Sequence, residues 1–215
     1  MSLKKGDFIT IDYTAKDKES NKVFDTTEEQ EAKKNNIYNA KIKYKSVTIC
    51  LRENQILQGI DDFLIDKDQD KEYEIEIPPE KGFGKKDPHL FKIMPAKEFK
   101  KQNIAPFPGL HVRFDELQGT IRSVSGGRII VDFNHILAGH TLVYKIKTHK
   151  LIKEDNKKIE SLLVHLDEKA KVTIKDKESE ISSSLPEPLQ KYFEDKIKQL
   201  IPSIKEVKFK TPDKQ

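Results

Sequence analysis

The segment VDFNHILAGHTLVYKI, residues 131–146, places polar side chains between two apolar runs that have the composition of β-strands. Asp132, Asn134 and His135 bring an acid, an amide and an imidazole close together in the sequence. Two interpretations are open: a catalytic constellation of the kind found in hydrolases, or a tight connection beside a binding pocket. The residues around this segment are needed to choose between the two.

The hydrolase interpretation needs a nucleophile that His135 could activate while Asp132 orients the imidazole. No serine or cysteine lies close to His135 in the sequence. Asp and Asn side chains frequently form hydrogen bonds with the backbone of turns. We therefore favour a structural role for Asp132 and Asn134, and keep His135 and Leu137 as candidates for a pocket wall.

Segments on both sides of this region alternate between apolar and polar residues, which predicts strands. The expected strands are ITIDYTA (9–15), SVTICL (46–51), EYEIEIP (72–78) and TLVYKIKTHKLI (141–152). In the third of these, Tyr73, Ile75 and Ile77 lie on one face and three glutamates on the other, so one face is expected to be buried.

Two short helices are expected among these strands. One covers LQGIDDFLI, residues 57–65, because its apolar residues Leu57, Ile60 and Leu64 share one helical face. The other follows a strand end at 23–24, and its candidate N-caps are Asp25, Thr26 and Thr27.

The composition changes from Lys86 onward, where prolines interrupt the chain and a hairpin pattern follows. Residues 120–124 and 128–133 flank Gly126-Gly127, a pair that readily adopts the positive φ angles of a tight turn. The segment also has its own set of apolar residues, namely Leu90, Phe91, Phe99, Phe107, Leu110, Val112 and Phe114. A small inserted unit is therefore predicted.

A third region follows Ile152. An amphipathic helix is expected over 187–201, with Leu189, Phe193, Ile197 and Leu200 at helical spacing, and EVKFK (206–210) is expected to form a strand. The apolar face of this helix could pack on the region's own strands or form a homodimer contact, and the sequence leaves both open.

The composition narrows the class of protein. Among 215 residues, 35% are hydrophobic and 35% charged, as in a globular protein with a heavily solvated surface. The net charge is +4 and lysines alternate with acidic residues, so a phosphate-tracking surface for nucleic acid is not expected. The single cysteine, Cys50, excludes an intramolecular disulfide and is expected to be a buried apolar residue in a protein of a reducing compartment.

Several other sites and locations are not expected. The N-terminus lacks the apolar segment of a signal peptide and no apolar run reaches about 18 residues, so a cytoplasmic protein without a membrane contact is predicted. The glycine-containing GFGKK (82–86) lacks the remaining residues of a phosphate loop. The histidines are scattered and cysteine pairs are missing, so neither a metal site nor a cofactor is predicted.

Five segments carry a resemblance to a known family, namely ITIDY (9–13), VFD (23–25), ENQILQGID (53–61), EIEIPPEKGFGKKDP (74–88) and DFNHILAGHTLVYKI (132–146). They resemble FKBP-type peptidyl-prolyl cis-trans isomerases, and most closely the SlyD-like and archaeal long-type branch. The resemblance implies an α+β fold, in which an FKBP-like antiparallel β-sheet wraps on a short helix. It also implies a small, mainly β inserted flap domain and a C-terminal α/β domain.

The implied boundaries divide the chain into three domains. Residues 1–87 and 132–152 would form the discontinuous isomerase domain, 88–131 the insert-in-flap domain, and 153–215 the C-terminal domain. The resemblance covers residues 1 to 152 and extends to the last domain only through its position and mixed composition.

The resemblance also implies which residues form the substrate pocket: Tyr13, Phe24, Asp25, Ile56, Leu57, Ile60, Phe83, His135, Leu137 and Tyr144. In this family pattern Ile56 and Ile60 would form the floor under the proline ring, with Phe24 and Tyr144 as walls. The backbone N–H of Leu57 would bind a substrate carbonyl, and Asp25, held by Tyr13, would lie near the rotating amide. From the residues alone, a position in the core would be favoured for the apolar members; the family resemblance reverses that preference.

This sequence departs from the family pattern at three places. Ile60 replaces a tryptophan of the small human-type members, which puts affinity for macrolide immunosuppressants in doubt. Phe83 stands where many relatives have tyrosine, so a hydroxyl that could bind substrate is lost. The histidine- and cysteine-rich tail of bacterial SlyD is missing, so nickel delivery is not transferred to this chain.

The chemistry of prolyl isomerisation suits such a pocket. The X-Pro bond rotates over a barrier of ~18–20 kcal/mol without any bond being made or broken, so no nucleophile is required. We therefore expect an enzyme that isomerises X-Pro bonds in unfolded or proline-containing polypeptides. The alternative is a catalytically weak module that binds peptides in the same groove.

The insert is expected to add chaperone activity of the holdase type. The family resemblance implies an exposed apolar surface that grips unfolded chains, and the candidate client-binding residues are Leu90, Phe91, Ile93, Phe99, Phe107 and Val112. Some of these side chains must form the core of the insert itself. A homodimer through the C-terminal domain is a further possible partnership.

Overall fold

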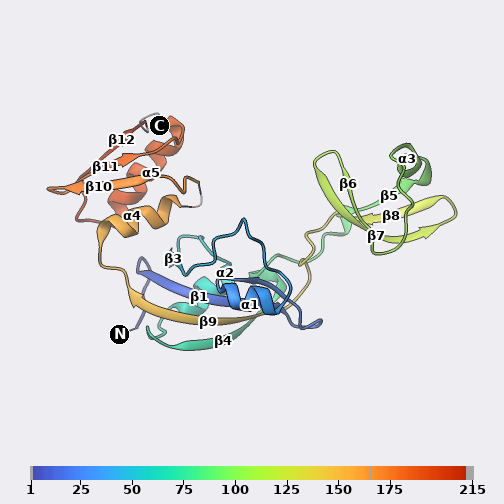
Figure 1. Cartoon of the computed structure of the whole chain (residues 1–215), viewed down its shortest axis with the longest axis horizontal. Helices are drawn as coiled ribbons and strands as arrows, with labels where there is room; N and C mark the ends of the chain where they lie inside the picture. The colour runs from blue at the N-terminus through green and yellow to red at the C-terminus, as the bar shows by residue number, and fades with distance from the viewer. Residues whose placement is uncertain (1, 165, 212–215) are drawn as a thin grey trace. The chain divides into compact units, whose positions relative to one another are not determined.

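The computed structural model describes residues 2–164 and 166–211, which divide into two compact units (Figure 1). One unit is formed by the segments before Pro78 and after Leu142, and the other spans Pro78–Leu142. Each unit has its own sheets, helices and core. The α+β class expected from the sequence is confirmed.

The first unit contains a five-stranded sheet with the order β2-β1-β9-β4, and β3 also pairs with β1. Its strands are β1 (Phe8–Asp17), β2 (Val23–Thr26), β3 (Val47–Cys50), β4 (Glu72–Ile77) and β9 (Leu142–Leu151). β1 pairs with β2 and with β3 in the antiparallel direction. The alternation of apolar and polar residues therefore predicted β1, β3, β4 and β9, and the strand end expected at 23–24 lies in β2.

Helix α2 (Gln58–Leu64) packs on this sheet beside β4. Ile60 and Leu64 are fully buried, as expected for the apolar face of an amphipathic helix. Gly59 brings the helix close to the sheet, because a Cβ atom at this position would lie 2.6 Å from Cγ2 of Ile77. The predicted helix is confirmed, and the glycine fixes its distance from β4.

Helix α1 (Glu29–Lys34) begins later than the sequence suggested. Its N-cap is Glu28, so the predicted caps Asp25, Thr26 and Thr27 are wrong. Asp25 and Thr26 still belong to β2, and the hydroxyl of Thr27 accepts a hydrogen bond from the backbone N–H of Tyr13 at 3.0 Å. Asp25, Thr26 and Thr27 therefore bind to β1, although the local pattern had assigned them to the start of the helix.

The second unit contains a four-stranded antiparallel sheet with the order β5-β8-β7-β6. Its elements are the 3-10 turns η1 (Pro79–Lys81) and η2 (Pro88–Leu90), the strands β5 (Phe91–Pro95), β6 (His111–Phe114), β7 (Leu117–Ser125) and β8 (Arg128–Asp132), and helix α3 (Ala96–Lys101). Gly126 and Gly127, with φ of +53° and +76°, connect β7 to β8. The predicted hairpin is confirmed.

The core of the second unit contains Phe99, Val112, Ile121, Ile129 and Val131. Phe99 and Val112 are buried there, so these two of the six candidates are the ones that form the core of the insert, as the sequence required of some of them. A small unit needs its largest apolar side chains inside to be stable, and Phe99 supplies one of them by packing edge-on against Phe114.

The chain after β9 forms a three-stranded sheet with two helices. The elements are α4 (Asp155–Leu163), β10 (Lys171–Lys175), β11 (Glu178–Ser182), α5 (Glu187–Leu200) and β12 (Glu206–Lys210). β10 and β11 are antiparallel, whereas β11 and β12 are parallel. Helix α5 and strand β12 lie where the sequence predicted them. Among residues 2–164 and 166–211, no helix has the length and apolar composition needed to span a bilayer.

The apolar face of α5 packs on the strands of its own region. Phe193 and Ile197 are buried in a cluster that also contains Ile181 of β11 and Val207 of β12. This observation supports the first of the two interpretations of that helix. Phe8 and Cys50 of the first sheet belong to the same cluster, so the region after β9 shares a core with β1 and β3. The expected burial of Cys50 is confirmed.

Candidate active site

Three aromatic rings meet across neighbouring strands of the first unit. Tyr13 lies on β1, Phe24 on β2 and Tyr144 on β9, and these strands are adjacent in the sheet. The ring centroids of Tyr13 and Tyr144 lie 5.7 Å apart, and those of Phe24 and Tyr144 lie 6.2 Å apart in an edge-on arrangement. Strand pairing therefore assembles an aromatic cluster from residues that are far apart in the sequence.

The hydroxyl of Tyr13 donates a hydrogen bond to Oδ2 of Asp25 at 2.8 Å. Burial raises the pKa of Tyr13 well above its ordinary value, and the charge of Asp25 and this hydrogen bond raise it further. Burial and the charge of Asp25 also raise the pKa of Tyr144. Both phenols therefore stay neutral near pH 7, and they can donate hydrogen bonds but cannot act as bases.

The loop before α2 contributes Ile56 and Leu57, which are both half-buried. Ile60 lies within α2 and has no exposed surface. A side chain without exposed surface cannot touch a bound proline ring in this conformation. The floor position expected for Ile60 is therefore corrected to a core position, whereas Ile56 and Leu57 keep surface that a ligand can contact.

Phe83, His135 and Leu137 belong to the second unit. The rings of Phe83 and His135 stack with centroids 4.4 Å apart and an interplanar angle of 8°. Nδ1 of His135 accepts a hydrogen bond from the backbone N–H of Leu137 at 3.2 Å. The two connections that carry these residues are joined by a hydrogen bond of 2.8 Å from the N–H of Gly139 to the carbonyl of Gly84. The three predicted residues therefore form one local group.

The polar segment after β8 has the structural role that the sequence favoured. Oδ1 of Asp132 accepts hydrogen bonds from the backbone N–H and from Nδ2 of Asn134, at 2.9 and 2.8 Å. Oδ2 of Asp132 accepts hydrogen bonds from Nε and a terminal nitrogen of Arg122, at 3.0 and 2.8 Å. Burial acts to raise the pKa of Asp132, but the bonds from Asn134 and Arg122 outweigh it and lower that pKa.

The hydrolase interpretation is thereby wrong. Both carboxylate oxygens of Asp132 accept hydrogen bonds from Asn134 and Arg122, and Nδ1 of His135 is the acceptor for Leu137. Asn134 in turn accepts from the backbone N–H of Asp87 at 2.7 Å and donates to its carbonyl at 3.1 Å. These hydrogen bonds therefore join the segment that enters the insert, at Asp87, to the segment that leaves it, at Asn134.

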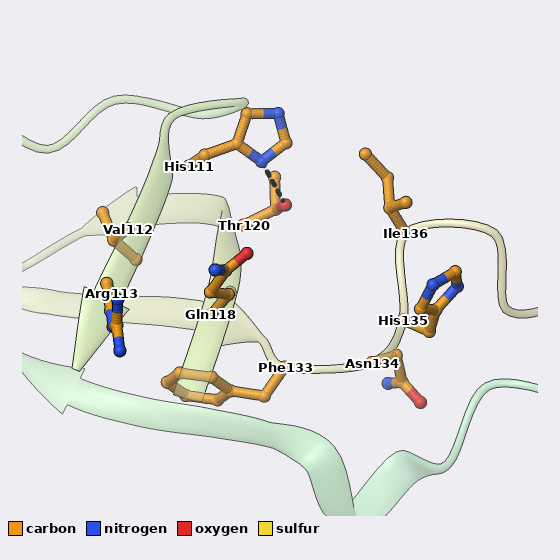
Figure 2. Close-up of a pocket in the computed structure, with 10 residues that line it drawn as sticks. His111, Val112, Arg113, Gln118, Thr120, Phe133, Asn134, His135 and Ile136 are labelled. Carbon is orange, nitrogen blue, oxygen red and sulfur yellow. Dashed lines mark hydrogen bonds between the residues drawn. The ribbon is translucent and has the colours of Figure 1, made fainter. Parts of the chain in front are cut away.

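A hollow of about 480 Å³ lies in the second unit between the β6–β7 hairpin and the connection after β8 (Figure 2). In Figure 2, His111 and Thr120 project from the hairpin, and Ile136 lies across the hollow from them. Nδ1 of His111 lies 3.0 Å from the hydroxyl oxygen of Thr120. The lining combines apolar and polar side chains: His111, Val112, Arg113, Gln118, Gly119, Thr120, Phe133, Asn134, His135 and Ile136.

Sequence reasoning missed most of this hollow. The candidates predicted in the insert are all apolar, whereas His111, Gln118 and Thr120 are polar residues of strands. One available indication was Gly119 within a strand pattern, since a strand glycine often marks a close approach. A Cβ atom there would lie 2.7 Å from Cγ1 of Val131 and 2.9 Å from Cδ1 of Phe133.

Several large apolar side chains of the second unit are exposed. Four of the six predicted client-binding residues are among them, namely Leu90, Phe91, Ile93 and Phe107. Leu117, Val124 and Ile136 are also exposed and were not predicted. Ile93 and Ile136 have 67% and 64% of their surface exposed, the two highest fractions in this set.

An antiparallel sheet packed on a short helix and a cluster of rings beside the hydrogen-bonded pair of Tyr13 and Asp25 point to the class of peptidyl-prolyl isomerases, whose reaction needs no attacking group. The family model described as FKBP-type peptidyl-prolyl cis-trans isomerase matches residues 1–100. The model described as FKBP26, IF domain matches residues 92–137.

Individual relatives agree with the family models. The short-type peptidyl-prolyl cis-trans isomerase of Methanocaldococcus jannaschii is 31% identical over 145 residues, which cover 67% of this chain and 91% of that protein. The FKBP-type isomerase SlyD of Helicobacter pylori is 24% identical over 123 residues, which cover 56% of this chain and 66% of that protein. This chain belongs to the family of FKBP-type peptidyl-prolyl cis-trans isomerases and contains the inserted domain of its SlyD-like, long-type branch.

Proposed function

We propose that this isomerase acts on X-Pro bonds of unfolded and partly folded proteins, and that its insert holds these clients. The observation that carries the proposal is the cluster of Tyr13, Phe24 and Tyr144 on three neighbouring strands. The proposed division is an isomerase domain of residues 1–87 and 132–152, an insert of 88–131 and a C-terminal domain of 153–215. The proposed location is the cytoplasm, supported by a single, unpaired cysteine.

The proposed mechanism is selective stabilisation of the twisted amide. A planar X-Pro amide has a large dipole, whereas the amide twisted by about 90° has lost its resonance and much of that dipole. A ring-lined, poorly hydrated site disfavours the planar form more than the twisted one, and thereby lowers the barrier. An acceleration of ~10³–10⁶ requires only ~4–8 kcal/mol.

Each residue at the candidate site has a proposed role. Phe24 and Tyr144 act as apolar walls for the proline ring, and Ile56 contacts the ring from the loop before α2. The backbone N–H of Leu57 binds a substrate carbonyl. Asp25, oriented by its 2.8 Å hydrogen bond to Tyr13, lies beside the rotating amide. The family resemblance further proposes roles in the same reaction for Phe83, His135 and Leu137.

The insert is proposed to bind extended client segments through its hollow and the exposed apolar residues near it. Phe133 and Ile136 offer apolar contacts within the hollow, and Gln118 and Thr120 can form hydrogen bonds with a client backbone. Pockets that combine apolar walls with a few polar groups are typical of peptide and ligand sites. Binding there raises the local concentration of prolyl segments for the isomerase domain.

A deletion variant tests whether the insert binds clients while the isomerase domain alone catalyses. Hydrogen bonds link Asp87 to Asn134, and a 2.9 Å bond links the N–H of Phe133 to the carbonyl of Leu90, so the two ends of the insert lie side by side. Residues 88–131 can therefore be replaced by a short glycine linker. We expect the deletion variant to lose catalysis of proline-limited protein refolding while its activity on a proline tetrapeptide is largely kept.

Equal loss of both activities would contradict the proposed role of the insert. The alternative of a weak binding module predicts something else. In that case wild-type protein leaves the slow phase of refolding unchanged, and Asp25→Ala and Tyr13→Ala have no further effect. A homodimer through the C-terminal domain is a separate proposal, which light scattering of the full chain tests.

A further inference from the structure

The loop that joins β3 to α2, residues 51–57, is held in an unusual conformation. Arg52 and Asn54 have φ of +69° and +56°, in the left-handed region that residues other than glycine rarely adopt. From the core, Oδ1 of Asp61 accepts a hydrogen bond of 2.8 Å from the backbone N–H of Arg52. A backbone of this kind persists only where surrounding contacts maintain it. Those contacts therefore determine where Ile56 and Leu57 lie.

Gln55 links this loop to the region after β9. Its Oε1 accepts a hydrogen bond of 2.6 Å from the backbone N–H of Cys50, at the end of β3. Its Nε2 donates a hydrogen bond of 3.0 Å to the carbonyl of Ser161, in the last turn of α4. Carbonyls of a last helical turn lack partners within the helix, so the side chain of Gln55 supplies one.

A second connection runs from the same loop to α5. Glu53 forms an ion pair with Lys196, and both side chains are largely shielded from solvent. The hydrogen bond that Lys196 donates to Glu53 is the main reason that the pKa of Lys196 is raised. Nζ of Lys196 also lies over the ring of Tyr192, 5.7 Å from its centroid. The loop is therefore attached to both helices of the C-terminal region.

Packing alone does not hold the loop against these helices. A hollow of about 290 Å³ is lined by loop residues and by side chains of the C-terminal region, including Leu162, Tyr192 and Phe193. Apolar contact between the loop and the helices is therefore incomplete there. The directional bonds of Gln55 and Glu53 span this boundary, and Gln55 is the immediate neighbour of Ile56.

We infer that Gln55 is a positioning residue, through which helix α4 fixes Ile56 and Leu57 in the geometry that binds a prolyl substrate. This inference rests on the proposed function, which assigns substrate contacts to Ile56 and Leu57. Gln55 itself does not touch the substrate in this scheme, because both ends of its side-chain amide bind the protein. The C-terminal region thereby sets the affinity of the isomerase site for substrate.

Two variants test the role of Gln55. Gln55→Glu keeps an oxygen that can accept from Cys50 but places a second oxygen opposite the carbonyl of Ser161, whereas Gln55→Ala removes both bonds. Gln58→Ala is the matched control, because Gln58 is an exposed glutamine of the adjoining first turn of α2. The full-length proteins are compared by NMR exchange with a proline tetrapeptide, which gives both substrate affinity and the exchange rate at saturation.

Both Gln55 variants are expected to weaken tetrapeptide binding by about three- to tenfold, since a directional hydrogen bond that orders the loop is lost. The exchange rate at saturation is expected to stay within about twofold of wild type, because the groups around the rotating amide are unchanged. The backbone amide signals of Ile56 and Leu57 should shift in both variants, while Gln58→Ala leaves affinity and these signals as in wild type.

Wild-type affinity in both Gln55 variants would overturn the inference. So would a fall in the saturated exchange rate with unchanged affinity, because that result assigns Gln55 to the chemical step. If the wild-type protein binds the tetrapeptide without accelerating exchange, the proposed function fails instead. The affinities and amide signals of the variants then still report whether Gln55 positions the loop.

Discussion

Replacing Gly59 by alanine tests how closely α2 must approach the sheet. A Cβ atom at position 59 would lie 2.6 Å from Cγ2, 3.1 Å from Cγ1 and 3.3 Å from Cβ of Ile77. Carbon atoms in van der Waals contact are about 3.5–4.0 Å apart, so the shortest of these contacts is about 1 Å too close. Ile77 is buried and cannot rotate into solvent, so α2 must move away from β4.

The expected loss of stability follows from two opposing effects. Overpacking of a core typically costs about 1–3 kcal/mol, whereas alanine in place of glycine in a helix gains about 0.5–1 kcal/mol. We therefore expect Gly59→Ala to lower the free energy of unfolding by about 1–2 kcal/mol. For a protein of this size, that corresponds to a fall in Tm of about 2–8 °C.

Thermal unfolding of Gly59→Ala, Ile77→Ala and the double variant measures the effect. Ile77→Ala removes the two atoms that a Cβ at position 59 would approach most closely. The loss of unfolding free energy caused by Ile77→Ala should therefore be about 1 kcal/mol smaller in the Gly59→Ala variant than in the wild type. Tetrapeptide activity should fall as well, since a shift of about 1 Å in a positioning element costs up to ~10²-fold. An unchanged Tm for Gly59→Ala, or strictly additive effects in the double variant, would refute this account of the helix–sheet contact.

Three further predictions concern single side chains. Tyr13→Phe removes the 2.8 Å hydrogen bond to Asp25 and should lower kcat/KM for a proline tetrapeptide by about three- to tenfold; unchanged kcat/KM would show that the orientation of Asp25 is irrelevant. Burial raises the pKa of the Cys50 thiol to about 12, so iodoacetamide at pH 8 should modify Cys50 only in denaturant, and rapid labelling of the native protein would contradict its burial in the shared core. Burial acts to raise the pKa of Asp12, but its hydrogen bonds, led by that from His149, hold it below 3.8. The resulting stabilisation is present above pH 3.8 and is lost as the pH falls through the lowered pKa of Asp12. Asp12→Asn should therefore reduce the loss of stability in acid, measured as the free energy of unfolding against pH. The same acid-induced loss in wild type and variant would refute a stabilising role for the Asp12 carboxylate.

Strands β1, β3, β4 and β9 of the five-stranded sheet could be predicted because burial of one sheet face imposes a strict alternation, as Ile75 and Ile77 of β4 illustrate. Elements with fewer apolar residues were missed. Strand β11 has Ile181 as its only large apolar residue, and its place in a sheet depends on pairing with β10 and β12. Local sequence carries little information about such pairing.

The candidate site was predictable through family resemblance rather than through periodicity. Nothing in the local pattern around Phe24 or Tyr144 indicates that the two rings meet, because their contact depends on the order of strands in the sheet. The sequence also did not indicate which apolar residues of the insert are buried and which are exposed. Phe99 is buried and Phe107 is exposed, although the same residue type occurs at both positions.

The strand order has a consequence for synthesis of the protein on the ribosome. Strand β9 lies between β1 and β4, so the last strand of this sheet to be translated is one of its inner strands. The insert is complete before β9 emerges, and its hairpins pair residues that are close in sequence, which favours rapid folding. During translation the insert is therefore expected to fold first, whereas β1 and β4 cannot pair with β9 until that strand has been synthesised. A nascent chain arrested before β9 should already contain a folded insert beside an incomplete catalytic sheet.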